Sequence, residues 1–226
     1  MPVPATGGQL RTKIQDMQVG DYIACYWGYR DVTQKAIAYL GNDSYMTSEF
    51  SLTGEALIAG SNAGFKKFYL VKVDQGLLIS DRVLQNTISW DLLNTHDMVQ
   101  GFSKTLKDNG NTGLSYDFII RSLGGGNSYR DADGKSSTTD KGIGAWPTDN
   151  EYDKYVNGMF EGRDDVWHWS NPTYGGTYSW CWETPVLSTS NRILRSGAKV
   201  EMSAGSANAY SWFGFRPVFE YQEVTP

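Results

Sequence analysis

Cysteine, histidine and long apolar runs are scarce in this chain. Its 226 residues include two cysteines, Cys25 and Cys181, and two histidines, His96 and His168. One disulfide at most could form, which excludes a disulfide framework, and the wide spacing favours buried free thiols. No apolar run approaches the length of a membrane span. We therefore expect no membrane insertion and no disulfide-stapled fold.

Positive charge is also in short supply. The formal net charge is -5 and the isoelectric point is about 5.0. No basic stripe is available to neutralise phosphates, so nucleic acid is excluded as the main partner. Residues 1–5 do not show a basic segment followed by an apolar run, so no secretory signal is expected. These features predict a protein that either stays inside the cell in which it is made or leaves it as part of an assembly or by lysis.

Glycine and large aromatic residues are abundant instead. The chain has 25 glycines, 14 tyrosines and 8 tryptophans. This composition, with few helical periodicities, predicts short strands, long loops and little helix. Tyrosine and tryptophan give rigid contact area at low entropic cost, as recognition surfaces require. For any single tryptophan, burial in the core remains the competing interpretation.

The first third of the chain reads as strands joined by turns. Alternating or apolar runs predict strands over 19–26, 68–73 and 77–84, and the turn at 74–76 joins the last two into an antiparallel hairpin. Asp81 and Arg82 are adjacent and are interpreted as a weak surface ion pair. Residues 1–19 hold one short segment with helical spacing, which either docks on a neighbouring chain or is a loosely ordered terminus.

The middle of the chain mixes helix and strand signals. Residues 88–99 favour a short helix, 101–113 a polar loop and 116–123 a strand. A helix is predicted to start near Pro147, because Thr148 and Glu151 form a capping box. Tyr152, Tyr155 and Val156 follow at the spacing of an apolar stripe.

No motif in the chain carries recognisable catalytic chemistry. Neither histidine has a nucleophile in an elbow motif, and zinc spacings are missing. Asp131 and Asp133 resemble part of a calcium loop, but Lys135 stands where a third ligand is needed, so a metal-free turn is preferred and calcium stays open. Gly124 to Gly126 lack the lysine and helix of a phosphate loop.

Two arginine-centred blocks close the chain. Residues 191–198 and 212–220 each alternate apolar and polar side chains and predict short strands. The small polar run between them, Ser203 to Ser211, has neither helical nor strand periodicity and is interpreted as a displayed loop. Arg195 and Arg216 are expected to brace loops by bonds to carbonyls. The residues expected in the core are Trp167, Trp169, Phe213 and Phe215.

The order of these motifs resembles the formylglycine-generating-enzyme branch of the C-type-lectin-like fold. The resemblance rests on Pro147 to Tyr152, Val166 to Trp169, Arg192 to Gly197 and Gly214 to Arg216, and it covers residues 85–222. It implies an α+β fold, loop-rich with short antiparallel strands and few helices. We expect a C-type-lectin-like ligand-display domain over 86–226, preceded by a small β-rich attachment part over 1–85.

The chain departs from the oxidases of that branch in one respect. Those enzymes carry a copper-binding cysteine pair shortly after the block that matches Arg192 to Gly197. Residues 196–212 contain no cysteine. The resemblance therefore points to non-catalytic members, which include phage tail receptor-binding proteins and the variable proteins of diversity-generating retroelements.

The function that follows is host recognition by a phage tail or tail-like particle, without catalysis or a cofactor. The partners expected are a host cell-surface glycan or protein and other tail or baseplate proteins, with the chain assembled as a homotrimer. A structural baseplate adaptor is the alternative, and a hydrolase or oxidase a further one. The residues expected to contact the ligand are Tyr174, Tyr178, Trp180, Trp182, Ser203, Ser206, Asn208, Tyr210 and Trp212.

Overall fold

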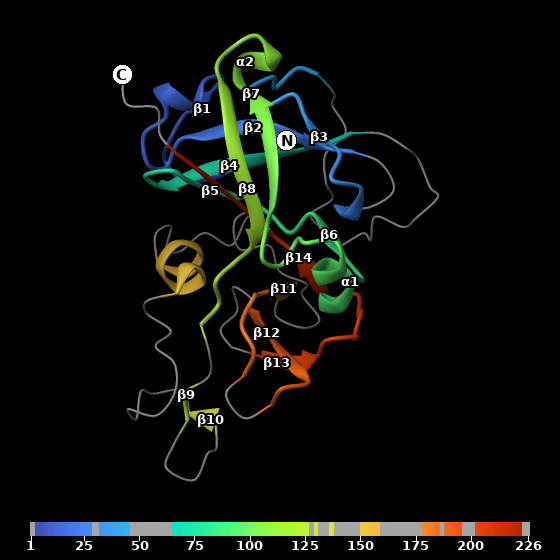
Figure 1. Cartoon of the computed structure of the whole chain (residues 1–226). Helices are drawn as coiled ribbons and strands as arrows, with labels where there is room; N and C mark the ends of the chain where they lie inside the picture. Colours follow the sequence, from blue (N-terminus) through green and yellow to red (C-terminus); the bar gives the residue numbers. More distant parts are fainter. Residues whose placement is uncertain are drawn as a thin grey trace.

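The computed structural model describes residues 3–28, 32–45, 65–126, 129–130, 136–137, 150–158, 178–185, 188–195 and 202–222. Strands dominate these residues, and the helices among them are few and short (Figure 1). The predicted strand-rich fold with little helix is confirmed. The signals behind that prediction were the alternating runs and the many turn-forming residues.

The larger of the two main sheets has eight strands and curls into a half-barrel (Figure 1). Its order is β1-β2-β4-β5-β15-β8-β7, and β3 pairs with β2. The strands are β1 (Leu10–Arg11), β2 (Tyr22–Trp27), β3 (Ile37–Ala38), β4 (Lys66–Asp74), β5 (Leu77–Ser80), β7 (Phe102–Lys107), β8 (Ser115–Ser122) and β15 (Pro217–Tyr221). The sheet draws strands from both sides of residue 85, where the sequence suggests a domain boundary.

The β4–β5 hairpin is confirmed where the sequence predicts it. Val71 pairs with Ile79, and Leu70 with Ser80. Gly76 turns the chain with φ 67°, and a Cβ there would lie 2.5 Å from the Tyr221 carbonyl oxygen. The turn therefore requires glycine both for its backbone angle and for the close approach of β15.

The N-terminal leader packs on its own chain. β1 runs parallel to β2, and the 3-10 turn η1 (Ile14–Asp16) follows it. Ile14 and Met17 are both buried in the main core. The interpretation of this segment as a loosely ordered terminus is therefore wrong, since Ile14 and Met17 pack in the core of their own chain. Docking of the leader on a neighbouring chain stays a prediction.

The tip of the β7–β8 hairpin bonds to the leader that follows β1. It therefore links the two ends of the half-barrel sheet, β7 and β1. This tip is the short turn α2 (Asp108–Asn111), in which Asn109 and Gly110 adopt left-handed backbone angles. The Asn109 N–H donates to the Thr12 carbonyl at 2.7 Å, and the Ile14 N–H donates to the Asp108 carboxylate at 2.9 Å. These bonds hold the leader against the far edge of the sheet.

Strand β7 corrects the prediction of a polar loop over 101–113. Phe102 and Leu106 face the core. Between them only Lys104 is on the same face of the strand, and it is not apolar. Two apolar residues in six gave too weak an alternation to indicate a strand. Pairing with β8 along the whole of β7, from Phe102 opposite Ile120 to Lys107 opposite Ser115, supplies the stabilisation that the local sequence lacks.

The smaller main sheet has five strands in the order β13-β12-β11-β14-β6. The strands are β6 (Gln85–Asn86), β11 (Tyr178–Trp180), β12 (Asn191–Arg195), β13 (Met202–Gly205) and β14 (Phe213–Phe215). The two predicted closing strands are present, but the second one splits, since β14 joins this sheet and β15 joins the larger one. The displayed loop is shorter than predicted, because residues 202–205 pair with β12 as an edge strand.

Short elements complete the described chain. They are η2 (Val32–Gln34), α1 (Trp90–Thr95), the π-helical turn η4 (Tyr152–Asn157) and the hairpin of β9 (Tyr129–Arg130) with β10 (Ser136–Ser137). Ser89 caps the start of helix α1, and its hydroxyl accepts a bond from the Leu92 N–H at 3.2 Å. Both predicted helices are confirmed where the structure describes them; Thr148 of the predicted capping box lies outside the described residues.

Two apolar cores support this arrangement. The main core joins the inner face of the half-barrel to the smaller sheet, and includes Phe68, Phe118, Trp180, Phe213 and Phe215. The second core lies where η4 covers the outer face of β2, β4, β5 and β15, and its helical members are Tyr152, Tyr155 and Val156. The predicted stripe of η4 and the predicted burial of Phe213 and Phe215 are confirmed, while Trp167 and Trp169 lie outside the described residues.

The pair formed by Asp81 and Arg82 is not on the surface. Both side chains are 0% exposed, and the Arg82 guanidinium donates to the Asp81 carboxylate at 2.6 to 3.1 Å. Arg216 lies beside them and donates to the carbonyls of Ser80 and Asp81. Adjacent opposite charges are ambiguous in sequence, and here the end of β5 turns both into the interior. Burial lowers the pKa of Arg216 to about 10, so it stays charged at neutral pH.

Candidate ligand-binding surface

The loop over residues 206–212, between β13 and β14, is held by hydrogen bonds along its length. The Asn208 N–H donates to Gly205 O at 3.0 Å, and the Phe213 N–H donates to Tyr210 O at 2.9 Å. Trp212 O accepts from the Tyr178 N–H at 2.8 Å, and Ser211 O accepts from the Asn86 side chain at 2.7 Å. Its backbone is therefore fixed before any ligand arrives, which lowers the entropic cost of binding.

A column of aromatic rings runs from this loop into the core. Tyr210 is 49% exposed and stacks on Trp212, with ring centroids 5.0 Å apart and planes inclined by 14°. Trp212 packs edge-on against the buried Phe213 at 6.0 Å, and Phe213 contacts Trp180 at 5.1 Å. One aromatic face thus points outward while the rings beneath it are anchored in the main core.

Helix α1 contributes a carboxylate beside the loop. The Asp91 N–H donates to Ser206 O at 3.1 Å, and the Ser206 hydroxyl donates to Asp91 Oδ2 at 3.0 Å. The helix is held below by Trp90, whose indole N–H donates to Cys181 O at 3.0 Å and whose ring lies 4.2 Å from the Arg192 guanidinium. Asp91 did not stand out in the sequence, because nothing local marks a contact between residues 115 positions apart.

The structure separates the predicted contact residues into groups. Tyr210 is exposed, while Tyr178, Trp182, Ser203, Ser206, Asn208 and Trp212 are half-buried. Trp180 is 0% exposed, with its indole N–H bonded to Ile88 O at 2.7 Å, so it supports the surface from below. This agrees with the alternation, which required at least one of Trp180 and Trp182 to lie in the core. Tyr174 lies outside the described residues.

Arginine side chains brace the loops around this sheet, as expected. Arg195 is buried and donates to Gly125 O at 2.6 Å and to the carboxylate of Asp153. Arg216 binds two carbonyls at the end of β5, as described above. Both guanidinium groups face the interior, so neither is available to a ligand at the surface.

The glycine run at 124–126 binds carboxylates of its own chain. The Gly124 N–H donates to Glu151 at 2.8 Å, and the N–H groups of Gly125 and Gly126 donate to Glu183 at 3.0 to 3.1 Å. A Cβ on Gly125 would lie 2.4 Å from Cys181 Sγ, so this position requires glycine. The N–H groups of this glycine run are therefore occupied by the carboxylates of Glu151 and Glu183, which stabilise the fold.

Replacing Glu183 with glutamine should change the free energy of unfolding, relative to the wild type, more favourably at pH 7 than at pH 4. Burial raises the pKa of Glu183 despite the bonds from Gly125 and Gly126. A carboxyl with a raised folded-state pKa stabilises the folded protein below its unfolded pKa of about 4.3, and this contribution is lost as pH rises through the folded value. Glutamine does not titrate. Urea denaturation of both proteins at the two pH values checks this; a variant favoured more at pH 4 contradicts it.

The two cysteines are free and buried. Burial raises the pKa of both thiols, so neither is a thiolate at neutral pH. In the part of the chain that the structure describes, no three histidine, cysteine, aspartate or glutamate side chains are grouped to hold a metal ion. Asp131, Asp133 and Lys135 of the calcium motif and His168 lie outside that part, and His96 is the C-cap residue that follows α1.

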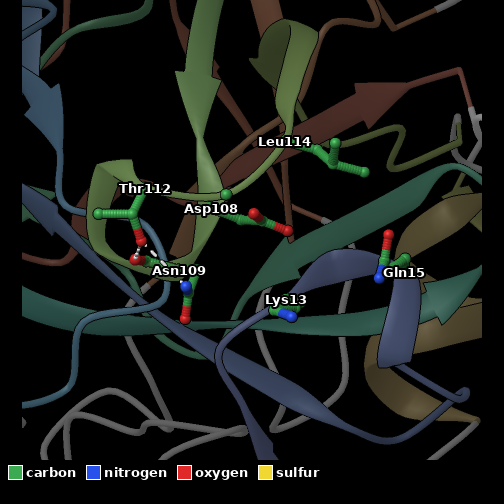
Figure 2. A pocket seen from close by; sticks show the side chains of 7 residues that line it. Lys13, Gln15, Asp108, Asn109, Thr112 and Leu114 are labelled. Carbon is green, nitrogen blue, oxygen red and sulfur yellow. Dashed lines mark hydrogen bonds between the residues drawn. The ribbon is translucent and has the colours of Figure 1, made fainter.

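A hollow of about 330 Å³ lies beside the β7–β8 tip (Figure 2). It is lined by Lys13, Gln15, Asp108, Asn109, Thr112, Gly113 and Leu114. Asn109 and Thr112 bond to one another, and Asp108 bonds to the leader. A Cβ on Gly113 would lie 1.8 Å from Asp108 Oδ1, so that oxygen is covered by the loop itself. The polar groups here serve to close the half-barrel.

Comparison with protein-family models, curated proteins and solved structures finds no significant match to this chain. Among the described helices, none has the length and apolar character needed to cross a membrane.

Proposed function

We propose that this chain is a non-catalytic receptor-binding protein of a phage tail or tail-like particle. Its frame would be a C-type-lectin-like domain of the formylglycine-generating-enzyme type, and its location the virion. The observation that carries the proposal is the anchored loop 206–212, which presents the stacked pair of Tyr210 and Trp212. Recognition surfaces commonly use exposed aromatic side chains that are held on a rigid backbone.

The chemistry of this region supports binding rather than thiol oxidation. Residues 196–212 are the stretch where the oxidases that the sequence resembles keep their cysteine pair, and they contain none. Cys25 and Cys181 are buried at other places in the fold. What this stretch does present is serine, asparagine, tyrosine and tryptophan, which suits a contact surface for a cell-surface glycan or protein.

Oligomerisation would strengthen such a contact. A single platform of one or two rings binds weakly, and several copies on one particle raise the overall avidity without any new contact. We therefore propose a homotrimer, attached to other tail or baseplate proteins through the part that precedes residue 86.

Purified protein should bind cells of the strain that the phage infects, and Tyr210→Ala should weaken that binding at least about tenfold. The matched control is Tyr45→Ala, because Tyr45 is 39% exposed and also stacks on a neighbour, Tyr39. Binding is measured by flow cytometry with labelled protein. Equal losses in both variants, or wild-type protein that does not bind the cells, would contradict the proposal. Normal cell binding by a chain with residues 206–212 exchanged, but failed particle assembly, would identify an adaptor instead.

A further inference from the structure

We infer that the ligand is a neutral oligosaccharide. One of its sugar rings stacks on the outer face of Tyr210, and hydroxyl groups of the oligosaccharide form hydrogen bonds with Asp91 and Ser206. This inference rests on the proposed function and names the ligand class of the same surface. It adds Asp91, from α1, to the contact residues of the loop.

The size of the apolar platform favours a sugar over a protein. Tyr210 is the one strongly exposed large apolar residue of the described loop, and its exposed neighbours are Ala207, Ala209 and Ser211. A stable protein interface buries about 800 Å² on each partner around an apolar centre. One exposed ring among small residues matches the face of a single sugar ring instead.

The stacking of the pair leaves one aromatic face free. One face of Tyr210 lies against Trp212, with planes inclined by only 14°, so its 49% exposure lies at the edge and the opposite face. The face of an aromatic ring carries negative partial charge, which attracts weakly positive C–H groups. The axial C–H groups of a pyranose present such a surface, and Trp212 keeps the tyrosine ring from turning away.

The bonded pair of Asp91 and Ser206, at the start of the loop that carries Tyr210, offers hydrogen-bond acceptors. The Ser206 hydroxyl donates its proton to Asp91 Oδ2, so its oxygen can only accept from a further group. Asp91 is exposed, and within the described part of the chain its Oδ1 accepts no hydrogen bond. A hydroxyl-rich ligand can donate to both residues at once. Ser206 and Tyr210 are four residues apart, a reach of at most about 14 Å, so an oligosaccharide covers both.

The negative charge of Asp91 indicates which glycans the surface accepts. Asp91 is the charged side chain that bonds to loop 206–212 among the described residues. A carboxylate repels a carboxylated or phosphorylated sugar, and such repulsion costs more where the ligand displaces water. The surface therefore favours neutral sugars over acidic ones.

Two measurements test this inference. In the first, cells are treated with periodate, which cleaves sugar diols, or with protease, before labelled protein is added. Periodate should abolish binding and protease should leave it unchanged. Loss after protease alone would show a protein ligand, which overturns the glycan inference and leaves the proposed function standing. Untreated cells that bind no protein would overturn the proposed function itself.

In the second measurement, wild-type protein and variants are applied to an array of neutral and acidic oligosaccharides. We expect neutral sugars to be retained, Tyr210→Ala to lose at least about tenfold in affinity, and Tyr210→Phe to stay within about threefold. Asp91→Asn should bind neutral sugars about fivefold more weakly and discriminate less against acidic ones. Preference for acidic sugars by the wild type, or an unaltered Asp91→Asn profile, would overturn the inference. Equal denaturation midpoints confirm that each variant is folded.

Discussion

Replacing Asp81 with asparagine should lower the free energy of unfolding by about 3–5 kcal/mol. Asp81 and Arg82 are both fully buried, and Arg216 lies beside them. Asparagine keeps the volume and can still accept from the Tyr69 N–H, which bonds to Asp81 at 3.0 Å. The loss therefore measures the removal of the carboxylate charge that faces the buried Arg82 guanidinium. Urea denaturation followed by tryptophan fluorescence gives the value.

Asp117→Asn is the matched control for this substitution. Asp117 is exposed on β8, and its one described side-chain bond comes from the Thr105 hydroxyl at 2.6 Å. Its replacement should change stability by no more than about 0.5 kcal/mol. The double variant Asp81→Asn with Arg82→Met removes both charges, keeps an acceptor for the Tyr69 N–H and should recover most of the loss. A loss below about 1 kcal/mol for Asp81→Asn would mean that the pair is as weak as a surface pair.

Replacing Trp180 with alanine should lower the free energy of unfolding by about 3–5 kcal/mol. The indole is 0% exposed, contacts Phe213 at 5.1 Å and donates to Ile88 O at 2.7 Å. Its removal leaves a cavity under the aromatic column and an unpaired carbonyl. Thermal and urea denaturation both report the change, with a large drop in the transition temperature.

Tyr210→Ala serves as the comparison, since Tyr210 is the exposed end of the same column. Its removal uncovers Trp212 but opens no cavity, so stability should fall by less than about 1 kcal/mol. The effects on cell binding should be reversed. Trp180→Phe keeps the core filled and should bind cells almost as well as the wild type, whereas Tyr210→Ala should bind them more weakly. A Trp180→Phe variant that folds normally but has lost binding would place Trp180 in the contact surface.

Strong local signals predicted several elements correctly. The β4–β5 hairpin, β2, β8 and the short helix α1 all lie where the pattern of apolar residues and turn residues places them. Strand β7 was missed because its alternation is weak, and β13 because small polar residues carry no period. Both strands are stabilised by pairing with a neighbouring strand, β7 with β8 and β13 with β12, and this contribution does not show in the residue pattern of the strand itself.

The aromatic surface shows the same division. The sequence singled out Tyr210 and Trp212 as contact residues, and the structure shows them stacked at the surface. It also singled out Trp180, two residues from Trp182 on the same strand face, without deciding which of the two is buried. Asp91 could not be found, because its bond to Ser206 exists only after α1 packs beside the smaller sheet.

Composition and pattern alone determined that this chain is strand-rich, poor in helix, acidic and without a local catalytic motif. They did so because turn residues, alternation and charge act over a few neighbouring positions. Only the tertiary structure decided that Asp81 and Arg82 are buried, that the leader closes the half-barrel, and that Asp91 bonds to Ser206 of the loop. Each depends on segments far apart in the chain, whose contacts form when two sheets pack on a shared core.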